Sequence, residues 1–254
     1  MTNYLFTRLN FEVPFSGAEY LNESDVSRVI NPVLTPESGF VNWFFGGSAD
    51  SLVSYDGTHT MTQADTSLEK AYGSNYVQLP ANASTLMNGL RTEYGDSDTH
   101  TICAVVRYSG EASQIIMGCI SNAFGEGFQM TGGSVLSYVY KTKDTAQTVA
   151  TAVPLPSGIA AGTDIFIAIT RNGNDSIAFV GGASTKLSVS AARNVDATLK
   201  FGPGNTNFTT AAGYSKSLRC YEFLYSASSL SASQLDSVYA NAKLRCALRG
   251  ITIL

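Results

Sequence analysis

The sequence predicts an all-β fold, a sandwich of two antiparallel sheets closed by a short C-terminal α-helix. Three observations lead to this prediction. Runs of β-branched and aromatic residues recur between turn signals along the chain, an Asn-Gly pair stands between two such runs, and one capped amphipathic segment comes only at the end. No linker rich in proline or serine divides the chain and no internal repeat is visible, so we expect a single domain over residues 1–254.

The first half of the chain contains widely spaced predicted elements. Residues 5–13 predict a strand, residues 39–46 predict an aromatic strand or turn region, and residues 75–80 predict a short strand that a proline ends. Residues 22–30 predict a short helix with acidic residues in its first turn. Residues 99–108 are apolar on both faces towards their end, which is typical of a central strand covered on both sides.

The second half predicts a denser series of strands. Four runs separated by Gly or Lys-Asp turns predict an antiparallel meander over residues 114–120, 127–130, 134–142 and 145–153. Two further runs flank Asn172 and Gly173, a pair that favours the positive φ values of a tight hairpin turn. The remaining predicted strands, including the two of this hairpin, cover residues 164–170, 176–180, 186–190, 197–201 and 217–225.

The C-terminal segment from Leu230 carries the signals of a helix start. Ser231 and Gln234 have the spacing of a capping box, and Leu230 and Leu235 have that of a hydrophobic staple. The apolar residues that share one helical face are Leu235, Val238, Tyr239 and Ala242. We therefore expect one amphipathic helix that ends near Lys243.

These parts together resemble the concanavalin A-like jelly rolls, which include the laminin-G-like sandwiches. The resemblance rests on the Tyr-Val-Gln-Leu-Pro segment at 76–80, the core strand 99–108, the hairpin 164–180, and the closing strand and helix over 218–243. It covers most of the chain and implies a jelly-roll sandwich of two antiparallel sheets. The chain also looks like the small jelly-roll proteins that tailed bacteriophages carry on heads or tails, which implies a virion location.

Composition excludes several classes of partner. Charged residues make up 14% of the chain, well below the roughly 25% usual for soluble domains, so the surface is mainly Ser, Thr, Asn and Gly, as in many virion and extracellular proteins. A net charge of −4 without a Lys/Arg cluster argues against nucleic acid. No apolar run approaches the ~18 residues of a membrane span, and the N-terminus lacks the pattern of a signal peptide. We expect synthesis in the host cytoplasm.

The cysteines predict no zinc site, because none of them forms a Cys-x-x-Cys pair. They are Cys103, Cys119, Cys220 and Cys246. We expect buried thiols, with a Cys103–Cys119 pairing between consecutive strands as the alternative. The resemblance implies no cofactor except calcium between sheet-edge loops, for which Asp96 and Asp98 are the candidate ligands. A solvated loop is the other interpretation of these two aspartates.

The resemblance also gives two catalytic patterns to compare, and neither is complete. Hydrolases of this fold carry Glu-x-Asp-x-x-Glu on one strand, whereas Glu23 and Asp25 lack the third carboxylate. Jelly-roll lyases have a histidine where this chain has Ile116. We therefore expect a protein that is not an enzyme.

Sugar binding requires an aromatic platform with amides and hydroxyls beside it. The aromatic residues close to Gly, Asn and Ser-rich turns, or on a two-sided strand, are Trp43, Phe124, Tyr138, Tyr140 and Tyr214. Asn205 and Asn207 are the candidate polar contacts in the loop after residue 201. Packing and turn formation are the alternative roles of all seven residues.

The first hypothesis is a non-enzymatic virion surface protein with a lectin-like domain that binds host-surface carbohydrate. The second is a decoration protein that binds neighbouring capsid or tail subunits without sugar, and the third is a polysaccharide-degrading enzyme. Since heptads and collagen-like repeats are absent from the sequence, a homo-oligomer would form through folded surfaces.

Overall fold

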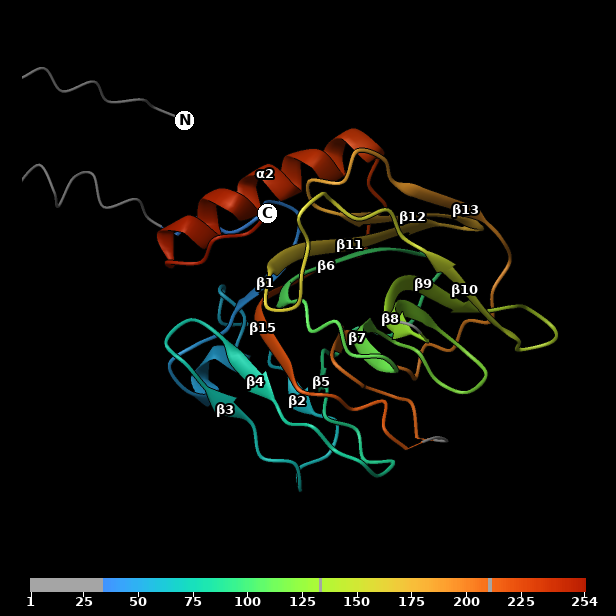
Figure 1. The fold of residues 1–254 in the computed structure, drawn as a ribbon, viewed down its shortest axis with the longest axis horizontal. Coiled ribbons are helices and arrows are strands. Elements are labelled where there is room, and N and C mark those ends of the chain that lie inside the picture. The colour runs from blue at the N-terminus through green and yellow to red at the C-terminus, as the bar shows by residue number, and fades with distance from the viewer. Residues whose placement is uncertain (1–33, 133, 210–211) are drawn as a thin grey trace, which may run out of the picture. The chain divides into compact units, whose positions relative to one another are not determined.

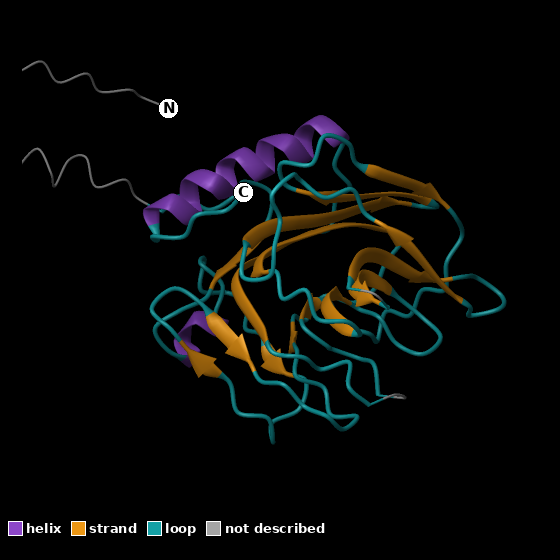
Figure 2. Ribbon diagram, viewed as in Figure 1, coloured by secondary structure: helices purple, strands orange, loops and turns teal. Residues whose placement is uncertain are grey.

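Two large antiparallel sheets stack face to face in the computed structural model (Figures 1 and 2). The structure describes residues 34–132, 134–209 and 212–254. Contacts divide the chain into the units Met1–Leu34 and Thr35–Leu254, and both sheets belong to the second unit. The strand predicted over residues 5–13 and the helix predicted over 22–30 lie outside the described residues. The β-sandwich with a C-terminal helix is confirmed.

The larger sheet has eight strands with β6 and β15 at its centre. Its order is β13 (Leu187–Ser190), β12 (Asp175–Val180), β11 (Asp164–Asn172), β6 (Thr99–Arg107), β15 (Leu218–Ser226), β4 (Val77–Leu79) and β3 (Ala71–Tyr72), and β1 (Val41–Phe44) pairs with β15. Strand β6 is buried along nearly its whole length, as predicted, because β11 and β15 flank it and both faces are covered.

The smaller sheet has five strands and contains the predicted meander. Its order is β10 (Thr148–Ala152), β9 (Val135–Lys141), β8 (Glu126–Thr131), β7 (Gln114–Gly118) and β14 (Gly202–Pro203). A two-stranded sheet joins β2 (Thr62–Gln63) to β5 (Leu90–Arg91), and a 3-10 turn, η1, spans Ala49–Leu52. The predicted strand 197–201 is wrong, because this segment connects the sheets and only Gly202 and Pro203 pair with β7.

The predicted β11–β12 hairpin forms, but its turn lies one residue further along. Asn172 pairs with Asp175, so Gly173 and Asn174 are the two turn residues. Gly173 has a φ of +60°, the left-handed value that favours glycine. The turn therefore has glycine in its first central position rather than an Asn-Gly centre.

Helix α2 (Ala232–Leu248) covers the outer face of the larger sheet. Ser231 and Gln234 form the predicted capping box. The buried helical residues Leu235, Val238 and Ala242 pack with side chains of β6, β11, β12 and β15. The helix continues to Leu248, beyond the predicted end, because Cys246 is also buried against the sheet.

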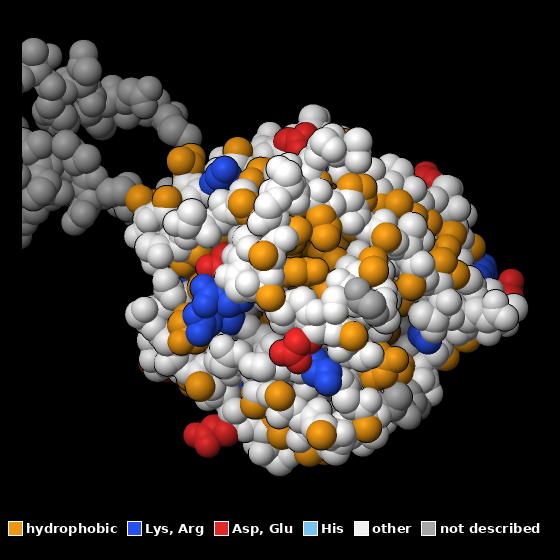
Figure 3. All heavy atoms as spheres, in the orientation of Figure 1, with side chains coloured by type: hydrophobic (Ala, Val, Ile, Leu, Met, Phe, Trp, Pro, Cys, Tyr) orange, Lys and Arg blue, Asp and Glu red, His pale blue; other side chains and the backbone are white. Residues whose placement is uncertain are grey.

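The four cysteines are free and buried, as predicted. Cys103 packs under the helix and Cys119 packs between the sheets, so the alternative pairing of these two is wrong. Among the helices of the described residues, none is long and apolar enough to cross a membrane. Charged side chains are sparse on the face shown in Figure 3, as the composition predicts.

Candidate functional site

The outer face of the five-stranded sheet carries the candidate site. Side chains alternate along a strand, so Tyr138 and Tyr140 of β9 point into the core between the sheets while Val139 points outward. Val139 packs with Ile115 and Ile120 in a small cluster separate from that core. The half-buried rings of Phe208 and Tyr214 pack against this cluster. An apolar floor thus lies on the side of the sheet that faces away from the core.

A depression of about 320 Å³ opens above this floor, and we call it the outer-sheet depression. Its lining residues are Ile115, Ile120, Asn122, Gln129, Lys141, Thr148, Phe208 and Tyr214. The ring centroids of Phe208 and Tyr214 are 4.7 Å apart at an interplanar angle of 60°. The depression therefore combines an aromatic pair with amide, hydroxyl and ammonium groups.

Asn205 holds one wall of the outer-sheet depression in place. Its amide nitrogen donates to the Phe208 carbonyl at 2.8 Å and to Ser215 Oγ at 3.1 Å, and its Oδ1 accepts from the Phe208 N–H at 2.9 Å. The Ile115 N–H donates to the Tyr214 carbonyl at 3.2 Å, which ties the same loop to β7. The structure gives Asn205 a positioning role and corrects the prediction of direct ligand contact, because Asn205 is buried with its amide occupied.

Lys141 and Thr148 face each other across the β9–β10 pair. Lys141 Nζ donates to Thr148 Oγ1 at 2.6 Å. Lys141 is only 6% exposed, and burial lowers the pKa of its ammonium. The sheet thus holds a cationic group at the edge of an apolar floor.

The seven residues predicted to contact sugar lie in different parts of the structure. Tyr214 lines the outer-sheet depression. Phe124 and Asn207 are half-buried outside its lining, and the Asn207 amide donates to Lys200 O at 2.9 Å. The predictions for three aromatic residues are corrected, because their rings are buried in the core between the sheets: Trp43, Tyr138 and Tyr140.

A second depression, of about 270 Å³, lies between the β11–β12 hairpin and the start of α2. Its lining includes Arg171, Asp175, Ile177 and Leu230. None of its described lining residues is aromatic, so it offers no ring face to a ligand. The outer-sheet depression is therefore the stronger candidate.

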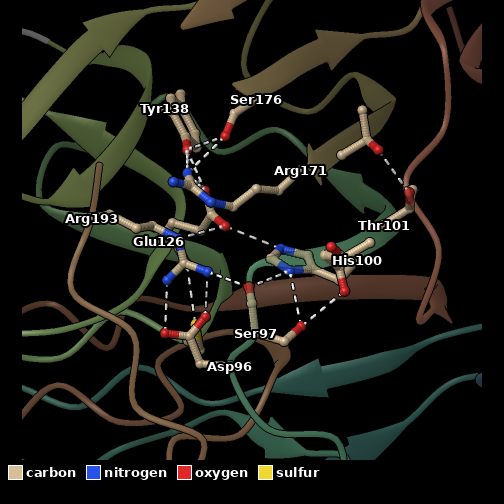
Figure 4. Close-up of polar contacts among 12 residues, drawn as sticks. Asp96, Ser97, His100, Thr101, Glu126, Tyr138, Arg171, Ser176 and Arg193 are labelled. Atoms are coloured by element: carbon tan, nitrogen blue, oxygen red, sulfur yellow. Dashed lines mark hydrogen bonds and ion pairs between the residues drawn. The ribbon is translucent and has the colours of Figure 1, made fainter. Parts of the chain in front are cut away.

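A buried ionic network lies between the sheets (Figure 4). Arg193 is its centre and binds Asp96 through two contacts, Nη2 to Oδ1 at 2.6 Å and Nη1 to Oδ2 at 2.7 Å. Arg193 Nε also lies 3.1 Å from Glu126 Oε1, and Nη2 donates to the Ser97 carbonyl at 2.6 Å. One guanidinium thus joins two carboxylates that are far apart in the sequence.

Glu126 of β8 is the second member with several partners. Its Oε1 is 3.1 Å from His100 Nε2, and its Oε2 is 3.5 Å from Arg171 Nη1 and accepts from the Tyr138 hydroxyl. Arg171 Nη1 also donates to Ser176 Oγ at 2.8 Å. Two guanidinium groups balance the two carboxylates of the network, so its charges are compensated inside the sandwich.

This pairing corrects the calcium prediction for Asp96 and Asp98. Both Asp96 oxygens are engaged by Arg193, whose positive charge would repel a cation there. Asp98 is exposed, and its backbone carbonyl accepts from the Gly173 N–H at 2.7 Å. In the described part of the chain, no three His, Cys, Asp or Glu side chains gather in a group that could hold a metal.

The network predicts a specific loss of stability in acid. Burial raises the pKa of Glu126, but the charge of Arg193 and the contacts of His100 and Arg171 lower it by more, so the net pKa lies below its ordinary value. A carboxylate with a lowered folded pKa stabilises fully above its unfolded pKa and loses that contribution as pH falls towards the folded pKa. The stability advantage of wild type over Glu126→Gln should therefore shrink by about 1.4 kcal/mol per pH unit below about pH 4.

Urea unfolding of the two proteins between neutral pH and about pH 3 measures this advantage directly. Glu69→Gln is the matched control, because Glu69 is exposed and its variant should keep a constant difference from wild type. An advantage of wild type over Glu126→Gln that does not change with pH would contradict the lowered pKa.

Comparison with known proteins gives structural neighbours only. No family model and no curated protein matches the sequence. The receptor-binding domain of botulinum neurotoxin D is 10% identical, with a TM-score of 0.55 over 80% of this chain and 52% of that chain. Domain 4 of AbnA, an extracellular GH43 arabinanase from Geobacillus stearothermophilus solved with arabinotriose, is 12% identical, with a TM-score of 0.51 over 78% of this chain and 97% of that chain.

A third similar structure is the Trypanosoma rangeli sialidase solved with 2,3-difluorosialic acid. It is 12% identical, with a TM-score of 0.52 over 83% of this chain and 34% of that chain. This chain therefore spans about half of the neurotoxin domain and about a third of the sialidase. At these identities the similarity shows a shared β-sandwich fold.

Proposed function

We propose that this chain is a glycan-binding module whose binding site is the outer-sheet depression. The observation that carries the proposal is the half-buried Phe208–Tyr214 pair beside Asn122, Gln129 and Thr148. The carbon face of a pyranose packs on an aromatic ring, and its hydroxyls need oriented amides and hydroxyls. The outer-sheet depression supplies both on a rigid sheet.

Two further observations support this role. The volume of about 320 Å³ lies at the lower end of the range for small-molecule sites, which suits one or two sugar units. The structural neighbours include a neurotoxin receptor-binding domain and an arabinanase domain solved with arabinotriose. We infer that this chain also binds a carbohydrate. We further infer that its sandwich is of the concanavalin A-like jelly-roll type.

The module is proposed to bind sugar without cleaving it. Hydrolysis of a glycosidic bond generally needs a pair of carboxyl groups on either side of the bond. No carboxylate is among the described residues that line the outer-sheet depression. Glu126 of the same sheet points into the interior, where Arg193 and Arg171 pair with it. Release of reducing ends from a host polysaccharide would contradict this part of the proposal.

We propose a virion surface, of a bacteriophage head or tail, as the setting in which the module meets host carbohydrate. The sparse charge of the chain and its Ser, Thr and Asn content support this location. Mass spectrometry of purified particles tests it. Stoichiometric incorporation together with a blank glycan array would favour the decoration role instead.

Replacing one ring of the aromatic pair should weaken glycan binding while the fold remains. We expect Tyr214→Leu to weaken binding about tenfold or more, because leucine keeps the contact with Ile115 and Ile120 but has no ring face. Isothermal titration calorimetry with the strongest glycan-array ligand measures the effect. Tyr55→Leu is the control, since Tyr55 is 50% exposed and lies outside the outer-sheet depression. Equal affinity of Tyr214→Leu and wild type would contradict the site.

A further inference from the structure

Lys141 is the charged group that lines the outer-sheet depression. It is 6% exposed, and its stem is held by β9 between the neighbouring strands β8 and β10. An ammonium has three N–H donors, and the one hydrogen bond that Lys141 Nζ makes among the described residues goes to Thr148 Oγ1 at 2.6 Å. No described carboxylate lies within salt-bridge distance of Lys141.

The strongly buried arginines of the described chain are paired with carboxylates. Arg193 and Arg245 each contact two carboxylates, and Arg171 contacts Glu126. Burying a cation costs free energy unless an anion compensates it. Lys141 and Lys70 are buried to a similar degree with neutral partners, the Thr148 hydroxyl and the Leu68 carbonyl. Of the two, Lys141 lines the outer-sheet depression and Lys70 does not, so a ligand bound there can bring an anion to Lys141.

We propose that the glycan bound in the outer-sheet depression is acidic, and that its carboxylate or sulfate group pairs with Lys141. This inference rests on the proposed function. The Thr148 hydroxyl holds the ammonium at the edge of the depression, while Phe208 and Tyr214 receive the sugar ring. Gln129, which also lines the depression, can donate from its amide to a hydroxyl of the same sugar.

The test compares each acidic sugar with a counterpart in which the acid group is absent or esterified. The pairs are 3′-sulfolactose with lactose, 3′-sialyllactose with its methyl ester, and trigalacturonic acid with its methyl ester. Calorimetric titration of wild type should give at least about tenfold tighter binding of an acidic member than of its neutral counterpart, because a charge-assisted hydrogen bond is made only with the acid. The affinity should fall as salt rises. The sialylated and sulfated members distinguish carboxylate from sulfate.

Lys141→Met keeps the aliphatic stem and removes the charge, so it should abolish the preference for the acidic sugar. Lys143→Met is the matched control, because Lys143 is exposed, lies two residues further along the chain and is not part of the depression. Circular dichroism and thermal melting check that each variant is folded. If Lys141→Met does not fold, the affinities of wild type for the acid and for its ester still test whether the site prefers an acidic glycan.

The outcomes separate this inference from the proposed function. Equal wild-type affinity for acidic and neutral sugars, or a preference that survives in Lys141→Met, would overturn the role of Lys141 while glycan binding stands. Failure of every sugar to bind would overturn both.

Discussion

Arg193→Met should lower the free energy of unfolding by about 3–5 kcal/mol, because removing one partner leaves buried charges uncompensated. Arg193 is the shared cation of Asp96 and Glu126, and it also satisfies the Ser97 carbonyl. Methionine fills part of the volume but offers no donor. Equilibrium unfolding in urea, followed by fluorescence and circular dichroism, measures the loss.

Lys186→Met serves as the control for Arg193→Met. The Lys186–Asp236 pair has its carboxylate 57% exposed, and such pairs contribute about 0–1 kcal/mol. Adding Asp96→Asn to Arg193→Met should cost less than the sum of the two single variants, because the two groups contact each other. A loss below about 1 kcal/mol for Arg193→Met would show that the network contributes little to stability.

Much of the framework was predictable because local patterns determine it. The capping box at Ser231 and the apolar face of the last helix depend on residues within a few positions of each other. The hairpin around Gly173 was located from its turn residues, yet the register moved by one because glycine satisfies the positive φ in the first central position as well.

The prediction of Tyr138 and Tyr140 as sugar contacts was wrong because it chose the wrong alternating set of β9 side chains as the outward one. Both alternating sets of residues 135–141 contain apolar side chains, so the tyrosines were interpreted as facing outward, although the opposite set also contains Ser137 and Lys141. The tyrosines share the inner face with Leu136, and the outward set contains Val139 and Lys141. Choosing the opposite set would have placed Lys141 at the site from the sequence.

Long-range contacts account for the rest of the candidate site. Phe208 and Asn122 come from connections that are far apart in the sequence, and no local pattern indicates that they share a depression. Asp96 was interpreted as a metal ligand because its partner, Arg193, is 97 residues away. Trp43 lies near glycine-rich turns, but β1 pairs with the central strand β15, which places its ring in the core.

Arg249→Ala should cost about 3 kcal/mol of unfolding free energy, because it removes three charge-assisted hydrogen bonds from half-buried backbone carbonyls. Arg249 stands at the C-terminal cap of α2. Its guanidinium donates to Tyr221 O at 3.0 Å, to Phe45 O at 2.6 Å and to Asn75 O at 2.9 Å. These carbonyls belong to three separate segments, so the Arg249 side chain holds the end of the helix against the sandwich through hydrogen bonds to all three.

Arg249→Lys should be nearly as damaging as Arg249→Ala, because a single ammonium cannot reproduce the planar fork that reaches three diverging carbonyls. Lys243→Ala is the control on the same helix, and this exposed position should change stability by about 0.5 kcal/mol or less. Urea unfolding again provides the measurement, with hydrogen exchange at residues 244–248 showing whether the last helical turn opens first. Full stability of Arg249→Lys would mean that charge alone, rather than the fork of donors, holds the helix end.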